Sequence, residues 1–259
     1  MSGYPPPGPS YDLSGQTALV TGGGSGLGHR FASVLASAGA KVAVAGRRSD
    51  RLEAVAQEIG GNGGVAFPIV LDMADAASLR DAVARVEQAL GTVTILVNNA
   101  GVVDAQLATK MPLELIDHVI AVNLRGPFVL AREVALRLIK SGTPGRVINI
   151  SSLAAFSYPI KGSAMYSITK GAIVRMTEVL AVEWADANIN VNAIAPGAFA
   201  SEMTDGMLSR IGQDFIQRFP RKRLGDPAQL DTTLLYLASP ASDAVTGTII
   251  KVDDGQVGR

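Results

Sequence analysis

Residues 17–28 read TALVTGGGSGLG and join a short apolar run to a glycine-rich loop. The run at 17–20 has the β-branched, apolar character of a buried strand, and a helical pattern begins at about Leu27. Glycines let the backbone turn tightly here and let a ligand come close to it. Because a helix N-terminus attracts anions, this strand, loop and helix together predict a dinucleotide pyrophosphate site in an α/β sheet.

The spacing of this loop is T-G-x-x-x-G-x-G, carried by Thr21, Gly22, Gly26 and Gly28. It does not fit G-x-G-x-x-G, since Leu27 stands where that pattern needs its last glycine. The chain has no Gly-Lys dipeptide, which excludes a P-loop. A plain tight turn is the alternative interpretation, and the strand–loop–helix setting disfavours it. We expect the cofactor to contact Thr21, Gly22, Gly24, Ser25, Gly26, Leu27 and Gly28.

Strand-like and helix-like stretches alternate along the rest of the chain. Several strand-like runs are apolar throughout, as expected for strands covered on both faces. We predict strands at 17–20, 41–45, 65–71, 94–97, 146–150, 190–194 and 248–252. Helical stretches lie at 49–59, 76–90, 126–140 and 166–186. This alternation predicts an α/β fold: a doubly wound, Rossmann-type parallel sheet of seven strands with helices on both faces.

The alternation continues from Leu13 onward without a linker-like gap, so we predict one dinucleotide-binding and catalytic domain over 13–259. Residues 1–12 are rich in proline, which predicts a flexible N-terminal tail. Residues 198–223 interrupt the alternation of strands and helices, because they contain no clear strand, although they carry several large apolar side chains. A long irregular segment in a compact domain is usually functional or disordered, and the apolar content argues against disorder.

The overall composition excludes several classes of protein. Hydrophobic residues make up 47% and charged residues 18%, with a formal net charge of zero, which is typical of a soluble globular chain. No basic stripe is present, so we expect no nucleic-acid or membrane partner. The chain has no cysteine and two distant histidines, so we expect no metal site. It has no signal-like or membrane-spanning apolar run, and we expect a cytoplasmic location.

Tyr166 and Lys170 are four residues apart at the start of a helical stretch, so they share one face of that helix. They follow a predicted strand that ends in Ser151 and Ser152, and catalytic groups in such sheets lie beyond the carboxyl ends of strands. A free tyrosine has a pKa near ~10. A neighbouring ammonium and a positively charged nicotinamide would lower that pKa, and the pair could then exchange a proton while the cofactor exchanges a hydride.

With these motifs the chain resembles the single-domain members of the short-chain dehydrogenase/reductase family. The resemblance covers about 13–256 and rests on motifs that occur in the family's order. They are TGGGSGLG, NNAG at 98–101, Asn123, the Ser151-Ser152 pair, YSITK at 166–170, and Pro196-Gly197. The resemblance implies an oxidoreductase that uses NAD(P) and has its catalytic residues at Asn123, Ser152, Tyr166 and Lys170.

The resemblance also implies a role for each catalytic residue. Tyr166 would be the general acid and base, and Lys170 would bind the nicotinamide ribose and lower the tyrosine pKa. Ser152 would hydrogen-bond the substrate carbonyl, and Asn123 would position a water that relays protons from Lys170. The interval from Ser152 to Tyr166 is one residue longer than in many relatives, so Ser151 remains an alternative to Ser152.

Further cofactor contacts follow from the same resemblance. Asp72 and Met73 would contact the adenine, and Pro196 and Gly197 would flank the nicotinamide. The NNAG motif would support the cofactor and the central sheet through Asn98, Asn99, Ala100 and Gly101. Near the C-terminus the chain reads Val-Asp-Asp-Gly where relatives commonly have Val-Asp-Gly-Gly, and we expect that turn to be structural.

The end of the second predicted strand bears on the choice of nicotinamide. Relatives that prefer NAD have an acidic residue there, which binds both ribose hydroxyls. Here that position is Gly46, and Arg47 follows where relatives that bind NADP have an arginine. We therefore predict a preference for NADP(H), with NAD(H) as the alternative. Arg48 could share the contact with the 2′-phosphate or point away, and Arg47 could be merely a solvated side chain.

Residues 198–223 correspond to the family's substrate lid. Their apolar side chains, with Phe156, Tyr158, Pro159 and Ile160, predict an apolar pocket and favour an apolar ketone or a 3-oxoacyl substrate. The alternatives are a small core beneath the lid or a subunit contact. We also expect a homotetramer, formed partly through the helices after Asn123 and Ser163.

Three other functions are weighed against this one. The first is an NAD-dependent alcohol or sugar-alcohol dehydrogenase, and the second is a cofactor-sensing scaffold on the same fold. No residue of the Tyr, Lys, Ser and Asn set is missing, which disfavours a scaffold. The third is a serine hydrolase, which the lack of a G-x-S-x-G motif disfavours.

Overall fold

The structure is a computed structural model that describes residues 11–158 and 161–256. Most of the predicted tail, and Pro159 and Ile160 of the predicted pocket, lie outside the described residues. No helix within the described ranges is both long enough and apolar enough to cross a membrane.

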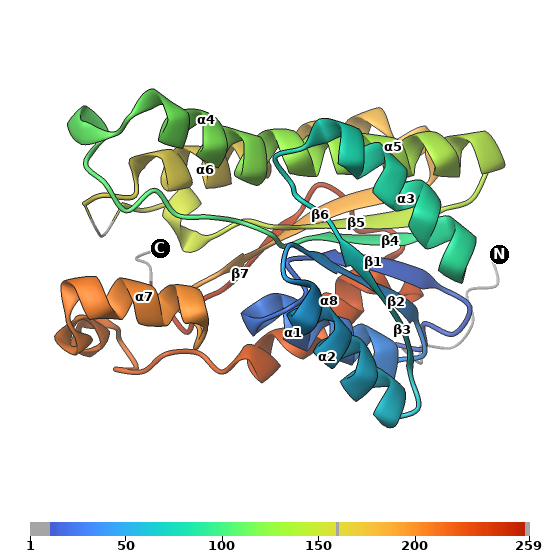
Figure 1. Ribbon diagram of the computed structural model, residues 1–259, viewed down its shortest axis with the longest axis horizontal. Coiled ribbons are helices and arrows are strands. Elements are labelled where there is room, and N and C mark those ends of the chain that lie inside the picture. Colours follow the sequence, from blue (N-terminus) through green and yellow to red (C-terminus); the bar gives the residue numbers. More distant parts are fainter. Residues whose placement is uncertain (1–10, 159–160, 257–259) are drawn as a thin grey trace, which may run out of the picture.

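A parallel sheet of seven strands in the order β3-β2-β1-β4-β5-β6-β7 forms the centre of the molecule (Figure 1). The strands are β1 (Thr17–Thr21), β2 (Lys41–Gly46), β3 (Val65–Val70), β4 (Ile95–Asn98), β5 (Gly145–Ile150), β6 (Ile189–Pro196) and β7 (Ile249–Val252). Every residue of β1 and β4 is buried, because helices cover both faces at the sheet's centre. The seven predicted strands and the doubly wound fold are confirmed.

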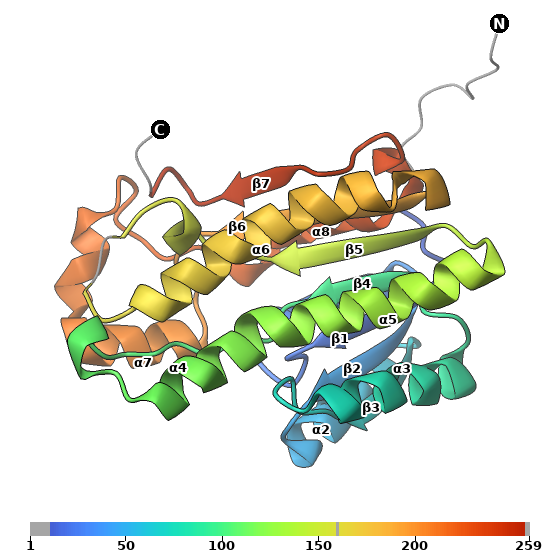
Figure 2. The same cartoon turned by 90° about the horizontal axis from the view of Figure 1, so that it is seen from above.

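Helices cover the sheet in two layers, each with its own hydrophobic cluster. One layer contains α1 (Gly26–Ser37), α2 (Ser49–Gly61) and α8 (Asp231–Ala238). The other contains α3 (Ala76–Leu90), α4 (Leu113–Ile120), α5 (Gly126–Ser141) and α6 (Ala164–Glu183). Figure 2 shows α3, α5 and α6 laid across the same face of the sheet. Fully buried aliphatic side chains fill both layers, and they fix the ends of the strands relative to one another.

The segment 198–223 folds beyond the carboxyl ends of the strands (Figure 1). It contains α7 (Glu202–Ile211) and the 3-10 turn Gln213–Arg218. Ser201 starts α7, because its hydroxyl accepts a hydrogen bond from the backbone N–H of Thr204 at 3.2 Å. An isolated bridge between Phe199 and Gly225 closes the segment at its base. We refer to residues 198–223 as the lid.

Candidate active site

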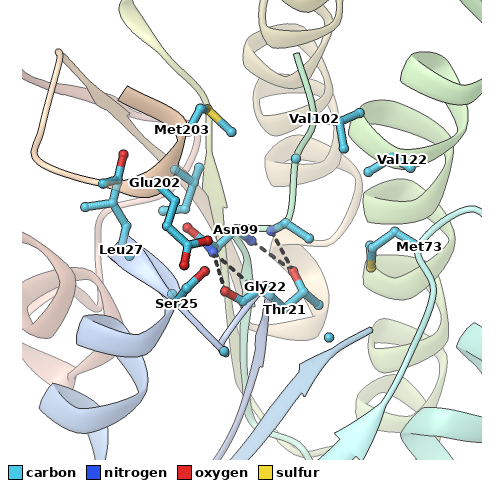
Figure 3. Close-up of a pocket in the computed structure, with 18 of the residues that line it drawn as sticks. Thr21, Gly22, Ser25, Leu27, Met73, Asn99, Val102, Val122, Glu202 and Met203 are labelled. Atoms are coloured by element: carbon cyan, nitrogen blue, oxygen red, sulfur yellow. Dashed lines mark hydrogen bonds between the residues drawn. The ribbon is translucent and has the colours of Figure 1, made fainter. Parts of the chain in front are cut away.

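The carboxyl ends of the central strands surround a cavity of about 510 Å³. The cavity lies beyond the ends of the neighbouring strands β1 and β4, where the strand order reverses direction, the position at which doubly wound sheets bind ligands. Every residue predicted to contact the cofactor lines it, together with Ser152. Figure 3 shows part of this lining, drawn from the glycine loop, the end of β4 and the lid. The predicted residues therefore come together in space, although they come from distant parts of the sequence.

The glycine loop can form only because its glycines have no side chains. Gly22 and Gly26 have φ values of +67° and +53°, which are strained for other residues. A Cβ atom on Gly28 would lie 2.1 Å from the carbonyl oxygen of Gly22. Ser25 is the N-cap residue of α1, yet its side chain makes no capping hydrogen bond. The backbone N–H groups at the start of α1 therefore suit an anionic ligand, as a pyrophosphate requires.

Thr21 and Asn99 fasten this loop to the end of β4. The Thr21 hydroxyl accepts hydrogen bonds from the backbone N–H groups of Asn99 and Ala100, at 3.0 Å and 3.1 Å. The Asn99 amide donates to the Thr21 carbonyl at 2.9 Å. Asn98 is buried and donates to Asn149 Oδ1 on β5 at 3.0 Å. The NNAG motif thus holds β1, β4 and β5 in register below the cavity.

Tyr166, Lys170 and Ser152 meet at the other end of the cavity. Lys170 is 5% exposed, and its Nζ donates to the carbonyl oxygen of Ile150 at 2.6 Å. The same Nζ lies 5.7 Å from the centre of the Tyr166 ring. The Ser152 side chain lies close enough to the Tyr166 phenol to favour its ionised form and so to lower its pKa. A phenol, a hydroxyl and an ammonium thus surround one point beside the predicted nicotinamide site.

The family described as short chain dehydrogenase matches residues 16–211. The chain belongs to the short-chain dehydrogenase/reductase family. It is 35% identical to the 3-oxoacyl-acyl-carrier-protein reductase of Aquifex aeolicus, over 94% of this chain and 98% of that protein. It is also 35% identical to the 2-dehydro-3-deoxy-D-gluconate 5-dehydrogenase of Bacillus subtilis, over 96% and 98% of the two chains.

Solved structures of the family agree with this assignment. A short-chain type dehydrogenase/reductase from Mycobacterium marinum superimposes with a TM-score of 0.93 at 36% identity, covering 96% of this chain and 98% of that one. A protein from Beutenbergia cavernae, described as an NAD(P)-dependent gluconate 5-dehydrogenase, was crystallised with NADP at low occupancy. It superimposes with a TM-score of 0.89 at 34% identity, over 96% and 99% of the two chains. The chain is therefore an NAD(P)-dependent oxidoreductase.

Burial sets the titration of the two central groups of this short-chain dehydrogenase. It raises the pKa of the Tyr166 phenol, and the hydrogen bond from Ser152 only partly opposes that effect. The lowering expected from the sequence depends on a bound, positively charged nicotinamide as well as on Lys170, and it stays a prediction. Burial also lowers the pKa of Lys170 from 10.5 to about 8.

Asn123 lies in a π-helical turn, Ala121–Arg125, between α4 and α5. Its side chain pairs with both backbone groups of Val102 at 2.8 Å and donates to Thr169 Oγ1 at 3.2 Å. A Cβ atom on Gly101 would lie 3.5 Å from Asn123 Oδ1 and 3.6 Å from Lys170 Nζ. These two polar atoms therefore border the same small space. Asn123 does not line the main cavity, and its role in a proton relay remains a prediction.

The structure favours Ser152 over Ser151 as the hydroxyl that meets the substrate. Ser151 is buried, and its Oγ donates to the backbone carbonyl of Lys170 at 2.9 Å. Both serines line the cavity, but only Ser152 affects the Tyr166 phenol, and its Oγ accepts a hydrogen bond from the N–H of Ala154 at 3.1 Å. The Ser151 hydroxyl is thus engaged in joining α6 to the end of β5, whereas the Ser152 hydroxyl lies beside the phenol.

The sequence did not indicate that Asp104 supports α6, the helix that carries Tyr166 and Lys170. Its buried carboxylate accepts hydrogen bonds from the backbone N–H groups of Met165 and Tyr166, at 3.0 Å and 3.3 Å. It caps α6 from another part of the chain, and the next residue, Ala105, has a left-handed φ of +54°. No local pattern connects Asp104 to a helix that begins about 60 residues later.

Arg47 and Arg48 follow the end of β2 and reach the cavity. Arg47 is exposed there. Arg48 Nη2 donates to Ser25 Oγ at 2.9 Å and to Glu202 Oε2 of the lid at 3.2 Å. Gly46 lies at the strand end, so no carboxylate occupies the place where a ribose 2′-hydroxyl is usually recognised.

Proposed function

We propose that this enzyme interconverts a ketone and a secondary alcohol with NADP(H), acting on an apolar ketone or a 3-oxoacyl substrate. The convergence of the Tyr166 phenol, the Ser152 hydroxyl and Lys170 at one end of the cofactor cavity carries the proposal. Two hydroxyl donors at one point fit a carbonyl oxygen that gains negative charge during reduction. A gluconate or other sugar dehydrogenase is the second candidate, because relatives of that kind match equally well.

In the reductive direction Tyr166 supplies the proton. Its burial raises the phenol pKa, so the proton is present on the phenol oxygen at neutral pH. Ser152 lies beside this phenol, and when substrate binds its hydroxyl would donate to the carbonyl oxygen, which orients the transfer. When bound, the cofactor exchanges the hydride, and its oxidised ring carries a positive charge that lowers the pKa of a nearby phenol.

The preference for NADP(H) is supported by the end of β2. No acidic side chain repels a 2′-phosphate at Gly46, and Arg47 is exposed beside that position. A charge-assisted hydrogen bond contributes about 1.5–3 kcal/mol, which is roughly ten- to a hundredfold in affinity. Arg48 is paired with the lid, so Arg47 is the better candidate of the two for the phosphate.

The substrate side of the cavity supports an apolar substrate. Val102, Phe199 and Met203 line it, and Phe156 and Tyr158 are exposed at the neighbouring loop. Two basic side chains lie at or near that end: Lys170 lines the cavity, and Lys251 Nζ lies 4.1 Å from the centre of the Phe156 ring. The proposal of an apolar substrate therefore rests on the apolar lining, and the substrate panel below separates it from a sugar acid.

Two variants test the proposed function. We expect Tyr166→Phe to lower turnover of ketones by about 10²–10⁴-fold while NADPH binding stays within a few fold, because only the proton donor is removed.

We expect Arg47→Ala to reduce the ratio of NADPH to NADH affinity by about tenfold or more. NADPH and NADH oxidation would be followed against ketones, 3-oxoacyl thioesters and keto-sugars. An unchanged affinity ratio in Arg47→Ala would refute the NADP(H) preference.

The assembly and the location are also proposed rather than observed. Exposed apolar side chains line the outer faces of α5 and α6, among them Phe128, Leu136, Ile139, Val179 and Val182. We propose that further copies of the chain cover this surface in a homotetramer. A cytoplasmic location fits the lack of cysteine.

A further inference from the structure

Glu202 of the lid reaches across the cofactor cavity to the glycine loop. It is the first residue of α7, and its Oε2 accepts a hydrogen bond from Arg48 Nη2 at 3.2 Å. The same Nη2 donates to Ser25 Oγ at 2.9 Å. Figure 3 shows the Glu202 carboxylate directed toward Ser25. A guanidinium and a carboxylate thus lie over the loop that forms the N-terminus of α1.

The charges at this contact bear on any phosphate-bearing ligand. Arg48 lowers the pKa of the Glu202 carboxyl through a hydrogen bond and through its charge, so Glu202 is ionised at neutral pH. The carboxylate stands on the cavity wall, where the loop and Arg47 suit an anionic cofactor. The negative charge of Glu202 repels the phosphates of a cofactor that enters the cavity. The ion pair also engages Arg48, whose positive charge could otherwise neutralise those phosphates.

The ion pair between Arg48 and Glu202 is weak enough for a cofactor phosphate to replace Glu202 as the partner of Arg48. The Arg48 and Glu202 side chains are 53% and 56% exposed, and solvent screens such pairs strongly. A phosphate carries more charge than a carboxylate and accepts several hydrogen bonds from one guanidinium. Arg48 therefore has two competing anionic partners, one from the lid and one from the cofactor.

We propose that Glu202 is a specificity-determining residue that restrains Arg48 and thereby weakens the binding of NADP(H) more than that of NAD(H). The inference rests on the proposed use of NADP(H). The two cofactors differ by the 2′-phosphate, so only NADP(H) gains from a released Arg48.

Fluorescence titration of NADPH and NADH binding tests this proposal without any substrate. We expect Glu202→Gln to lower the Kd of NADPH by about three- to tenfold and the Kd of NADH by less than twofold. Asp205→Asn is the matched control, because Asp205 lies in the same first turn of α7, is exposed and does not line the cavity. It removes the same charge and should leave both Kd values within twofold.

A double variant separates competition from simple repulsion. In an Arg48→Ala background, Glu202→Gln should tighten NADPH binding by less than twofold, because no arginine remains to be released. A gain of the original size in that background would overturn the competition for Arg48. An equal change for NADPH and NADH in the single variant, or none for either, would overturn the proposal as a whole.

The outcome is separable from that of the proposed function. Arg47→Ala, titrated in parallel, reports whether the enzyme distinguishes the 2′-phosphate at all. If Arg47→Ala loses the preference for NADPH while Glu202→Gln has no effect, only the inference about Glu202 fails. If Arg47→Ala has no effect, the preference for NADP(H) itself fails.

Discussion

Lys170 is held in a place that suits catalysis better than stability. Its ammonium is buried and donates a hydrogen bond to the carbonyl oxygen of Ile150. Loss of water lowers its pKa from 10.5 to about 8, so Lys170 binds its proton more weakly in the folded state than in the unfolded chain. Below pH 8 the folded protein bears the full cost of burying the charge. Functional residues are often kept at such a cost.

Replacing Lys170 should therefore stabilise the protein. Between pH 8 and 10.5 the unfolded chain binds the proton that the folded chain has released, so wild-type stability rises with pH through this window. We expect Lys170→Met to raise the free energy of unfolding by about 1–3 kcal/mol at pH 7, with a smaller gain at pH 9.5. Urea unfolding at both pH values measures this. An equal gain at both would show that the lysine does not titrate differently on folding.

Sequence reasoning located residues whose chemistry follows from local spacing. Tyr166 and Lys170 share one helix face because they are four residues apart, and the glycine loop is a continuous stretch. Asp104 and Glu202 were missed because their partners are distant, with separations of 62 residues to Tyr166 and 154 to Arg48. The raised pKa of the Tyr166 phenol could not be predicted either, since the sequence does not show how deeply the phenol is buried.

The C-terminal turn after β7 holds both ends of the lid. Gln256 Oε1 accepts a hydrogen bond from the N–H of Ala198 at 2.6 Å, at the start of the lid. Asp254 accepts from Arg221 and Arg223 at 2.7 Å each, at its end. Asp254 has a left-handed φ of +55°, and two ion pairs offset that strain. The unusual Val-Asp-Asp-Gly sequence thus connects the turn to the lid, which the sequence alone did not show.

Removing the charge of Asp254 should loosen the lid. Asn tolerates the left-handed backbone, so Asp254→Asn removes the two ion pairs with little added strain. We expect trypsin to cleave within the lid about threefold faster, because cleavage tracks local opening. Mass spectrometry of the fragments identifies the sites. Asp243→Asn is the control, since Asp243 pairs with Arg146, outside the lid. Equal cleavage rates in wild type and Asp254→Asn would contradict this function of the turn.

Among the secondary-structure elements, the strands could be predicted from the sequence more closely than the helices. The strands are short β-branched runs buried on both faces, and each was located to within two residues at either end. α7 was missed because Gly206 interrupts it and its cap depends on the Ser201 side chain. The π-helical turn Ala121–Arg125 could not be predicted either, because its Asn123 is held by Val102 and Thr169 from other elements.

At the scale of the whole molecule, the outer faces of α5 and α6 carry a group of exposed large hydrophobic side chains. Phe128, Leu136 and Ile139 of α5 border a hollow that is also lined by Leu180 of α6 and by Trp184, which follows that helix. The exposed side chains of Arg132 and Glu183 line it as well. An apolar furrow with a polar rim is typical of a surface covered by another protein chain. The formal net charge of zero also presents little repulsion between copies.

A single charge in this furrow should prevent the proposed assembly. Leu136 is 47% exposed, so Leu136→Glu can fold as a single chain, but a second copy would bury the new carboxylate without a partner. We expect light scattering to give about four times the 26.8 kDa chain mass for wild type and one or two times for Leu136→Glu. Val65→Glu, at a 49% exposed position on the edge strand β3, is the control and should keep the wild-type mass. A monomeric wild type would show that solvent, rather than a second copy, covers the furrow. Loss of assembly in both variants would point to non-specific destabilisation.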